Sequence, residues 1–185
     1  MGTTTKLSFE EFQKLQEAAE ETVRYELDEG ELLLTPSPTA RHNIVRYNLR
    51  HALTVFVKAH RLGLVLDETD FRLASNTVRK PDVAFIAQHY LGNFDLDHSP
   101  LSGAPSLAIE IISPTNRTQD TTKKVRQYLA AGCHSVWLVY PNLRLVEIHD
   151  TSGSHDVTEP QSIHEEKLFP GLIFSLSLAV LFDEQ

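Results

Sequence analysis

The chain has 185 residues, of which 41% are hydrophobic, and this length and composition predict a single domain over residues 1–185 with a sizeable core. Its formal net charge of −8 argues against a protein that coats nucleic acid, because affinity for a polyanion comes mainly from neutralised phosphates. The single cysteine, Cys133, excludes an internal disulfide and a cysteine-rich zinc site, which fits a reducing compartment.

The two ends of the chain favour a cytoplasmic protein. The first ten residues contain no apolar signal core. The apolar stretch at residues 168–182 contains Pro170 and falls short of the roughly 20 residues that a membrane-spanning helix needs. Lys and Arg concentrate between Arg41 and Arg126, which is compatible with a local phosphate-binding face and equally with an ordinary solvated surface.

The N-terminal third predicts a helix, a β-hairpin and a second helix. Ser8 and Glu11 form a capping-box pattern, which predicts a helix from there to about residue 19. The strand-like runs at 23–27 and 31–35 are separated by Asp28-Glu29-Gly30, a sequence typical of a hairpin turn. After two prolines, a longer helix extends to about residue 60. We expect its apolar stripe to consist of Ile44, Leu49, Leu53, Phe56 and Val57.

The rest of the chain alternates strands and one helix. Short strands at 64–68, 71–74 and 82–86 predict a meander, followed by a surface excursion over 88–105. A buried strand at 107–112 then leads to a helix, capped by Thr118 or Asp120, that Gly132 ends. With the next strand at 135–141, this order predicts a right-handed parallel crossover. The remaining expected elements are strands near 144–149 and 161–166 and a short apolar tail.

One glutamate, Glu110, interrupts the apolar strand at 107–112, and a buried carboxylate needs a positive partner. Asp82 follows Pro81 at the start of another apolar strand. If the two strands are neighbours, two carboxylates lie close together, and a hard cation such as Mg²⁺ between them would compensate both. Lys124 and Tyr128 lie one turn apart on the following helix and therefore face the same way.

These residues resemble the PD-(D/E)XK nuclease superfamily and, more closely, its Uma-type branch of restriction endonucleases. The resemblance rests on three blocks, residues 25–45, 70–86 and 107–141, which follow the pattern of that branch in order. It implies an α/β fold with a restriction-endonuclease-like core, in which helices flank a central mixed β-sheet, preceded by an N-terminal helix and β-hairpin. It also implies a metal-dependent phosphodiesterase site.

The resemblance assigns roles to residues. Asp82 and Glu110 match the ligands of a Mg²⁺ or Mn²⁺ ion, and Glu31 or Glu26 matches an additional acidic position. The superfamily motif expects lysine two residues after the glutamate, where this chain has Ile112. In the Uma-type branch the lysine comes from the helix that follows the strand of the glutamate. The resemblance therefore assigns the role of this lysine to Lys124. The implied activity is that of a DNA endonuclease, in which the metal activates a water and Lys124 holds that water or stabilises the charge on the phosphate.

Two classes of function remain open from the sequence. The alternative to the nuclease is a non-catalytic binding or regulatory module in which Glu110 and Lys124 form a structural ion pair. For the nuclease we expect duplex DNA as partner, no membrane, and a homodimer, since two cuts in a duplex need two sites. Four residues are candidate contacts to phosphate or DNA; the alternative for His42 is a surface or capping group, and the alternative for Arg46 and Arg50 is a solvated face. These candidates are His42, Arg46, Arg50 and Tyr128.

Overall fold

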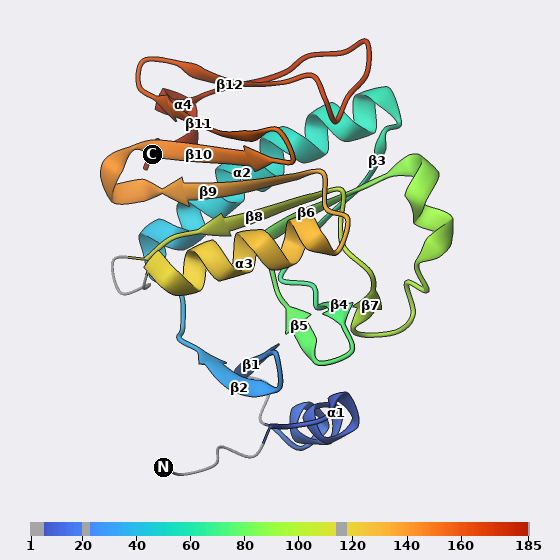
Figure 1. Ribbon diagram of the computed structural model, residues 1–185. Helices are drawn as coiled ribbons and strands as arrows, with labels where there is room; N and C mark the ends of the chain where they lie inside the picture. Colours follow the sequence, from blue (N-terminus) through green and yellow to red (C-terminus); the bar gives the residue numbers. More distant parts are fainter. Residues whose placement is uncertain (1–5, 20–22, 114–117, 185) are drawn as a thin grey trace.

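The computed structural model describes residues 6–19, 23–113 and 118–184, which form two main β-sheets with helices around them (Figure 1). The helices are α1 (Phe9–Ala18), α2 (Ala40–His60), α3 (Thr118–Ala130) and α4 (Leu178–Leu181), with 3-10 turns η1 (Gln88–Asn93) and η2 (Pro141–Leu143). The strands are β1 (Arg24–Asp28), β2 (Glu31–Thr35), β3 (Gly63–Asp67), β4 (Phe71–Ala74), β5 (Thr77–Arg79), β6 (Val83–Ala87), β7 (Leu101–Ser102), β8 (Leu107–Ile111), β9 (Ser135–Tyr140), β10 (Leu145–Asp150), β11 (Gly153–Thr158), β12 (Ser162–Glu165) and β13 (Phe174–Ser177).

The larger sheet has six strands in the order β11-β10-β9-β8-β6-β3. Its β8 and β9 are parallel and are joined through α3, while the other neighbouring strands are antiparallel. Figure 1 shows α3 crossing the near face of this sheet and α2 lying behind it. The predicted mixed sheet, its flanking helices and the parallel β8-α3-β9 connection are confirmed.

Strand β8 is buried on both faces, and its side chains alternate between two different neighbours. Leu107, Ile109 and Ile111 belong to the core that α2 covers, whereas Ala108 packs in the cluster formed with α3. Because side chains alternate along a strand, Glu110 lies on the same face as Ala108. The carboxylate of Glu110 is therefore directed toward α3.

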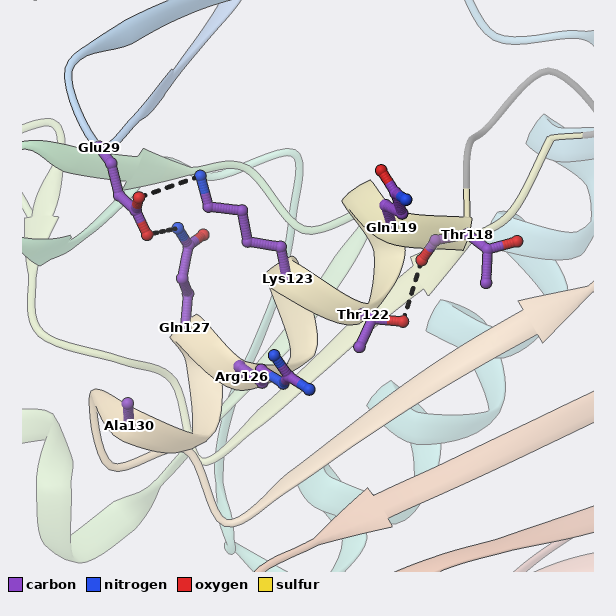
Figure 2. Close-up of a pocket in the computed structure, with 8 residues that line it drawn as sticks. All are labelled: Glu29, Thr118, Gln119, Thr122, Lys123, Arg126, Gln127 and Ala130. Atoms are coloured by element: carbon purple, nitrogen blue, oxygen red, sulfur yellow. Dashed lines mark hydrogen bonds and ion pairs between the residues drawn. The ribbon is translucent and has the colours of Figure 1, made fainter.

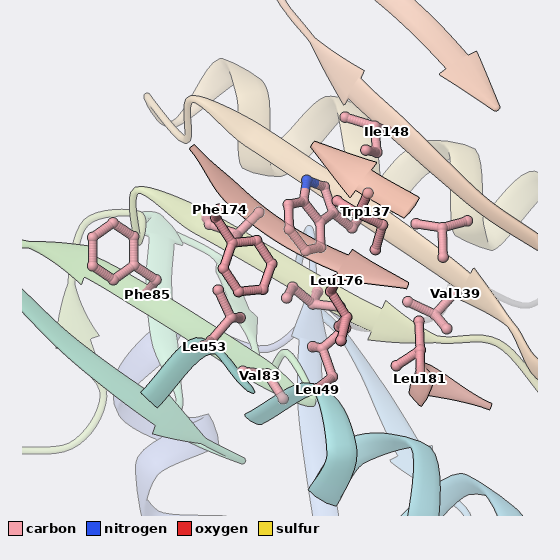
Figure 3. Close-up of a cluster of buried hydrophobic side chains, with 14 of the residues drawn as sticks. Leu49, Leu53, Val83, Phe85, Trp137, Val139, Ile148, Phe174, Leu176 and Leu181 are labelled. Carbon is pink, nitrogen blue, oxygen red and sulfur yellow. The ribbon is translucent and has the colours of Figure 1, made fainter. Parts of the chain in front are cut away.

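The main core lies between the larger sheet and α2 (Figure 3). Helix α2 contributes Val45, Leu49, Leu53 and Val57, which recur every fourth residue and are all buried. Of the predicted stripe, Phe56 is half-buried and packs against this core, whereas Ile44 is half-buried and its neighbour Val45 takes the buried position. The apolar C-terminal tail closes this core through β13 and α4, whose buried residues include Phe174, Leu176 and Leu181.

The second sheet has five strands in the order β2-β1-β5-β4-β7, and α1 packs on it through Phe9 and Phe12. The predicted capping box of α1 is confirmed, since Ser8 and Glu11 bond each other reciprocally. The β1–β2 hairpin is also confirmed. The predicted meander is wrong: β3 pairs with β6 in the larger sheet, while β4 pairs with β5 in the smaller one.

None of the described helices combines the length and apolar character that crossing a bilayer requires.

Four strands were not predicted from the sequence: β13, which lies in the segment expected only as an apolar tail, and three others with a clear physical reason. Strand β5 has only three residues with one aliphatic side chain, Val78, so it shows no alternation. Strand β11 is mostly exposed and polar, as an edge strand can be. Strand β7 lies in the predicted surface excursion and is held by a two-residue parallel pairing with β4. Such short or polar strands depend on their neighbours more than on their own sequence.

The core packing of α2 can be tested by comparing two positions on that helix. Leu53 is fully buried, whereas Val55 is 56% exposed. We expect Leu53→Ala to lower the free energy of unfolding by about 2–5 kcal/mol, because it removes buried methyl groups and leaves a cavity. Val55→Ala should change it by less than about 0.5 kcal/mol. Urea denaturation of the two variants measures both values, and equal losses would contradict this packing.

Candidate active site

The buried carboxylate of Glu110 has partners on both of its oxygens. Nζ of Lys124 lies 3.0 Å from Oε2, and the Tyr128 hydroxyl donates a hydrogen bond of 2.8 Å to Oε1. Both partners come from α3 and are one turn apart, as the sequence analysis predicted. The positive charge opposite Glu110 is therefore that of Lys124.

A second buried glutamate shares this lysine. Glu26, from β1, places Oε1 3.0 Å from Nζ of Lys124, and the same oxygen accepts a 3.0 Å hydrogen bond from the backbone N–H of Lys80. One ammonium group thus lies between two carboxylates. Burial raises the pKa of Glu110 to about 7; the charge of Lys124 opposes this rise, and those of Glu26 and Asp82 add to it. Glu110 thus shares one ammonium group with Glu26 and has the charge of Asp82 nearby, an arrangement that a bound cation would stabilise.

A fully buried arginine holds Glu26 from the other side. Arg79, 1% exposed, places Nη1 3.0 Å from Oε2 of Glu26 and Nη2 2.8 Å from Oδ1 of Asp28. Its Nε donates a 2.8 Å hydrogen bond to Oε1 of Gln127 on α3. Burial raises the pKa of Glu26, but the charges of Lys124 and Arg79 outweigh it, so the pKa is lowered overall. This network fastens β1 and β5 to α3.

Asp82 reaches the same region from the start of β6. Strand β6 pairs with β8 up to Val83 and Ile109, so the next antiparallel position sets Asp82 beside Glu110. The backbone N–H of Ile111 donates a 2.7 Å hydrogen bond to Oδ2 of Asp82. Nε2 of His42 lies 3.1 Å from Oδ1. The Asp82 side chain is therefore oriented by β8 and by the first turn of α2.

These groups meet in a cleft of about 310 Å³ between the two sheets, α2 and α3. Its lining includes His42, Lys80, Asp82, Glu110 and Lys124. Glu26 lies behind Lys124 and is almost fully buried. The cleft brings together the two carboxylates and the lysine that the sequence analysis singled out, together with His42.

A larger hollow of about 700 Å³ lies on the outer side of α3, and Figure 2 shows its lining. There Nζ of Lys123 pairs with Oε2 of Glu29 at 3.1 Å, and Nε2 of Gln127 donates a 3.2 Å hydrogen bond to Oε1 of the same residue. Lys123 thus faces away from Glu110, as the rotation of about 100° per residue in a helix requires. Of the two adjacent lysines, Lys124 is the one that contacts Glu110 and Glu26.

Three other candidates, Glu31, Arg50 and Tyr128, do not line the cleft. Glu31 is exposed at the start of β2, so of the two acidic alternatives the structure brings Glu26 to Lys124. Arg50 pairs with Asp67 at 3.4 Å. A contact from Tyr128 to phosphate is contradicted, because its side chain is fully buried and its hydroxyl is bonded to Glu110.

Sequence reasoning missed the cations that flank Asp82. In the sequence, Pro81 and Asp82 are directly preceded by Arg79 and Lys80. Because side chains alternate along a strand, the Arg79 side chain points into the protein interior. Nζ of Lys80 lies 3.4 Å from Oδ2 of Asp70, and Lys80 lines the cleft. The sequence did contain one signal for such a cation, namely an arginine close to the predicted acidic ligand Asp82. The partner of this arginine, Glu26, could not be predicted, because it lies 53 residues earlier in the chain.

The donor set fits a hydrated divalent ion better than an enclosed metal cage. Among the described residues, no group of three or more His, Cys, Asp or Glu side chains is arranged to hold a metal. Asp82 and Glu110 do line one cleft, and both offer carboxylate oxygens. Mg²⁺ commonly uses one or two carboxylates and completes its shell with waters and substrate phosphate. The arrangement therefore suits Mg²⁺ or Mn²⁺.

A protein-family model described as "Uma2: Putative restriction endonuclease" matches residues 9–180. The chain belongs to the Uma2 family. The predicted resemblance is confirmed by this match, which covers the blocks that carry Asp82, Glu110 and Lys124.

The fold of this Uma2 protein has a relative among solved structures. The crystal structure described as a putative nuclease belonging to DUF820, from Anabaena variabilis, superposes with a TM-score of 0.80 at 22% sequence identity. The match covers 95% of this chain and 97% of the other. A search of curated proteins found no match. The structural match confirms the predicted restriction-endonuclease-like fold.

The charge network of this Uma2 protein predicts that Arg79 is essential for stability. Arg79→Met would remove the buried cation between Glu26 and Asp28 and leave them only Lys124 and Lys123, so we expect the free energy of unfolding to fall by about 3–5 kcal/mol. Arg144→Met, which breaks the exposed pair with Glu159, should cost much less, because water screens that pair. Denaturant unfolding measures both, and a comparable loss in the two variants would contradict the role of Arg79.

Proposed function

We propose that this Uma2 protein is a metal-dependent phosphodiesterase that cleaves DNA, with Asp82, Glu110 and Lys124 at its centre. One observation carries the proposal: in a cleft, a half-buried lysine lies between two buried glutamates, next to an aspartate at the start of the neighbouring strand. This arrangement supplies oxygen ligands for a cation and a fixed ammonium group at the same place. Both are what phosphoryl transfer requires.

Asp82 and Glu110 would hold the Mg²⁺ or Mn²⁺ ion through their carboxylate oxygens. When bound, such an ion polarises a phosphoryl oxygen and lowers the pKa of a coordinated water. The hydrogen bond from Ile111 and the contact with His42 keep Asp82 in place, so its carboxylate needs little reorganisation to bind an ion. Tyr128 does the same for Glu110.

Lys124 would stabilise negative charge on the phosphate or hold the attacking water. Burial lowers the pKa of Lys124, but the charges of Glu110 and Glu26 outweigh it and raise the pKa overall. The ammonium group therefore stays protonated at neutral pH and acts as a donor. Glu26, itself held by Arg79, fixes the position of Nζ while leaving Lys124 part-exposed at the cleft.

The comparisons support the nuclease class. The family description names a restriction endonuclease, and the similar solved structure is described as a nuclease. For a member that cuts both strands of a duplex, two such sites are needed, so we propose duplex DNA as substrate and a homodimer as the active form.

A second candidate function is a non-catalytic module that keeps the nuclease fold. The observation in its favour is that both oxygens of Glu110 already have partners, as in a structural ion pair. Calorimetric titration with Mn²⁺ separates the two candidates. Absence of binding at millimolar Mn²⁺, together with a marked loss of stability in Lys124→Met, would favour the module.

Cleavage of plasmid DNA tests the nuclease. We expect the purified protein to cut DNA with Mg²⁺ or Mn²⁺ and to stop when EDTA removes the metal. Asp82→Ala and Glu110→Gln should lower the rate at least about 100-fold, because each removes a charged ligand of the ion. Glu10→Gln, an exposed change of the same charge on α1, serves as control. Cleavage that persists in Asp82→Ala would reject the assignment.

Lys124→Ala should separate metal binding from turnover. Lysine offers no lone pair to a cation when protonated, so Mn²⁺ should still bind, and its affinity should stay equal or rise because a competing positive charge is removed. Turnover should fall by about 10²–10³, the usual effect of deleting a donor to the developing charge. Calorimetry and cleavage assays measure the two quantities. Loss of Mn²⁺ binding in a variant that circular dichroism shows to be folded would contradict this role.

A further inference from the structure

Two arginines from different elements converge on one glutamate at the wall of the cleft. Nη1 of Arg24, at the start of β1, and Nη1 of Arg46, on α2, both contact Oε1 of Glu68. Glu68 follows β3 and has a φ of 47°, a conformation that non-glycine residues rarely adopt. Strained backbone of this kind tends to occur at functional sites.

The charges of this cluster do not balance. Two guanidinium groups face a single carboxylate, so the three side chains carry one net positive charge. Like charges converge at a cost unless an anion compensates them. Each guanidinium has five N–H donors, and each contacts Glu68 through Nη1, so its other nitrogens can serve a second acceptor. The fork of an arginine suits a phosphate oxygen pair in particular.

The cluster lies next to the proposed catalytic centre. Arg24 and Glu68 line the same cleft as Asp82, Glu110 and Lys124. The backbone N–H of Glu68 donates a 3.4 Å hydrogen bond to the carbonyl of Asp82, which fixes the cluster relative to that aspartate. The side chains of Arg24 and Glu68 line the cleft and are 34% and 26% exposed, and Arg46, which contacts Glu68 from outside that lining, is 19% exposed.

We infer that Arg24 and Arg46 form a subsite for a backbone phosphate of DNA that neighbours the one being cleaved. The inference rests on the proposed function, because it assigns this subsite to the same substrate. Glu68 holds the two arginines in place in the free protein and competes with the phosphate for them. The subsite binds phosphate alone, so it adds affinity without reading base sequence.

A purely structural role for the cluster makes a different prediction. If Glu68 only fastened β1 to α2, then Glu68→Gln and Arg24→Gln would both loosen the wall and both weaken DNA binding. If the two arginines form a phosphate subsite, the two substitutions change the affinity for DNA in opposite directions. Arg24→Gln removes a guanidinium that binds the phosphate, whereas Glu68→Gln removes the competing carboxylate and makes both arginines available to the phosphate.

The test measures binding of a labelled duplex of about 20 base pairs by fluorescence anisotropy, with Ca²⁺ in place of Mg²⁺ and gels to confirm intact DNA. NaCl is varied from about 50 to 200 mM. The slope of log K against log salt becomes shallower by roughly 0.9 for each phosphate that the protein no longer neutralises. Lys58→Gln removes one exposed charge from the last turn of α2, twelve residues or about 18 Å beyond Arg46, and is the charge-matched control.

We expect Arg24→Gln to weaken binding several-fold and to reduce the slope by about 0.9, while Lys58→Gln leaves the slope unchanged. Arg24→Lys, which keeps the charge, should retain most of the slope. Glu68→Gln should bind DNA at least as tightly as the unchanged protein. An unaltered slope in Arg24→Gln, or weaker binding in a folded Glu68→Gln, would overturn the subsite. If the unchanged protein neither binds nor cuts DNA, the proposed function itself fails.

Discussion

The burial of Glu110 against Lys124 is the interaction on which the site depends. A carboxylate in the middle of a strand covered on both faces costs several kcal/mol unless it is compensated. Lys124 supplies the compensating charge, and Tyr128 completes the hydrogen bonding of the second oxygen. The position of α3 on the sheet is therefore tied to the chemistry of the cleft, because moving the helix would leave Glu110 buried without its partner.

The other charged side chains near this pair lie on two sides of it, one in the protein interior and one at the open cleft. Arg79 lies between Glu26 and Asp28, and Lys123 also pairs with Asp28, so Glu26 can hold Lys124 while its own charge is compensated. On the open side, Asp82 adds a negative charge beside Glu110 and contacts His42. The carboxylates in the interior are thus compensated by the cations of the protein itself. Asp82 and Glu110, by contrast, line the cleft, where a divalent ion would compensate them.

The sequence predicted the elements that carry strong local signals. The capping box of α1, the hairpin turn after β1 and the single glutamate of β8 each have a local physical cause, and each was confirmed in place. Strand pairing was harder, because β3 skips the β4–β5 hairpin to reach β6. Arg79 and Glu68 could not be assigned at all, since their partners lie far along the chain and only the fold brings them together. Local pattern therefore located Asp82, Glu110 and Lys124 but not the cations that support them.

Anomalous diffraction from crystals grown with Mn²⁺ would test the central claim most directly. The account predicts one Mn²⁺ peak within coordination distance of carboxylate oxygens of both Asp82 and Glu110, with Lys124 nearby and not bound to the ion. A Mn²⁺ peak elsewhere, or an empty cleft at millimolar Mn²⁺ in which Glu110 keeps only Lys124 and Tyr128 as partners, would contradict it.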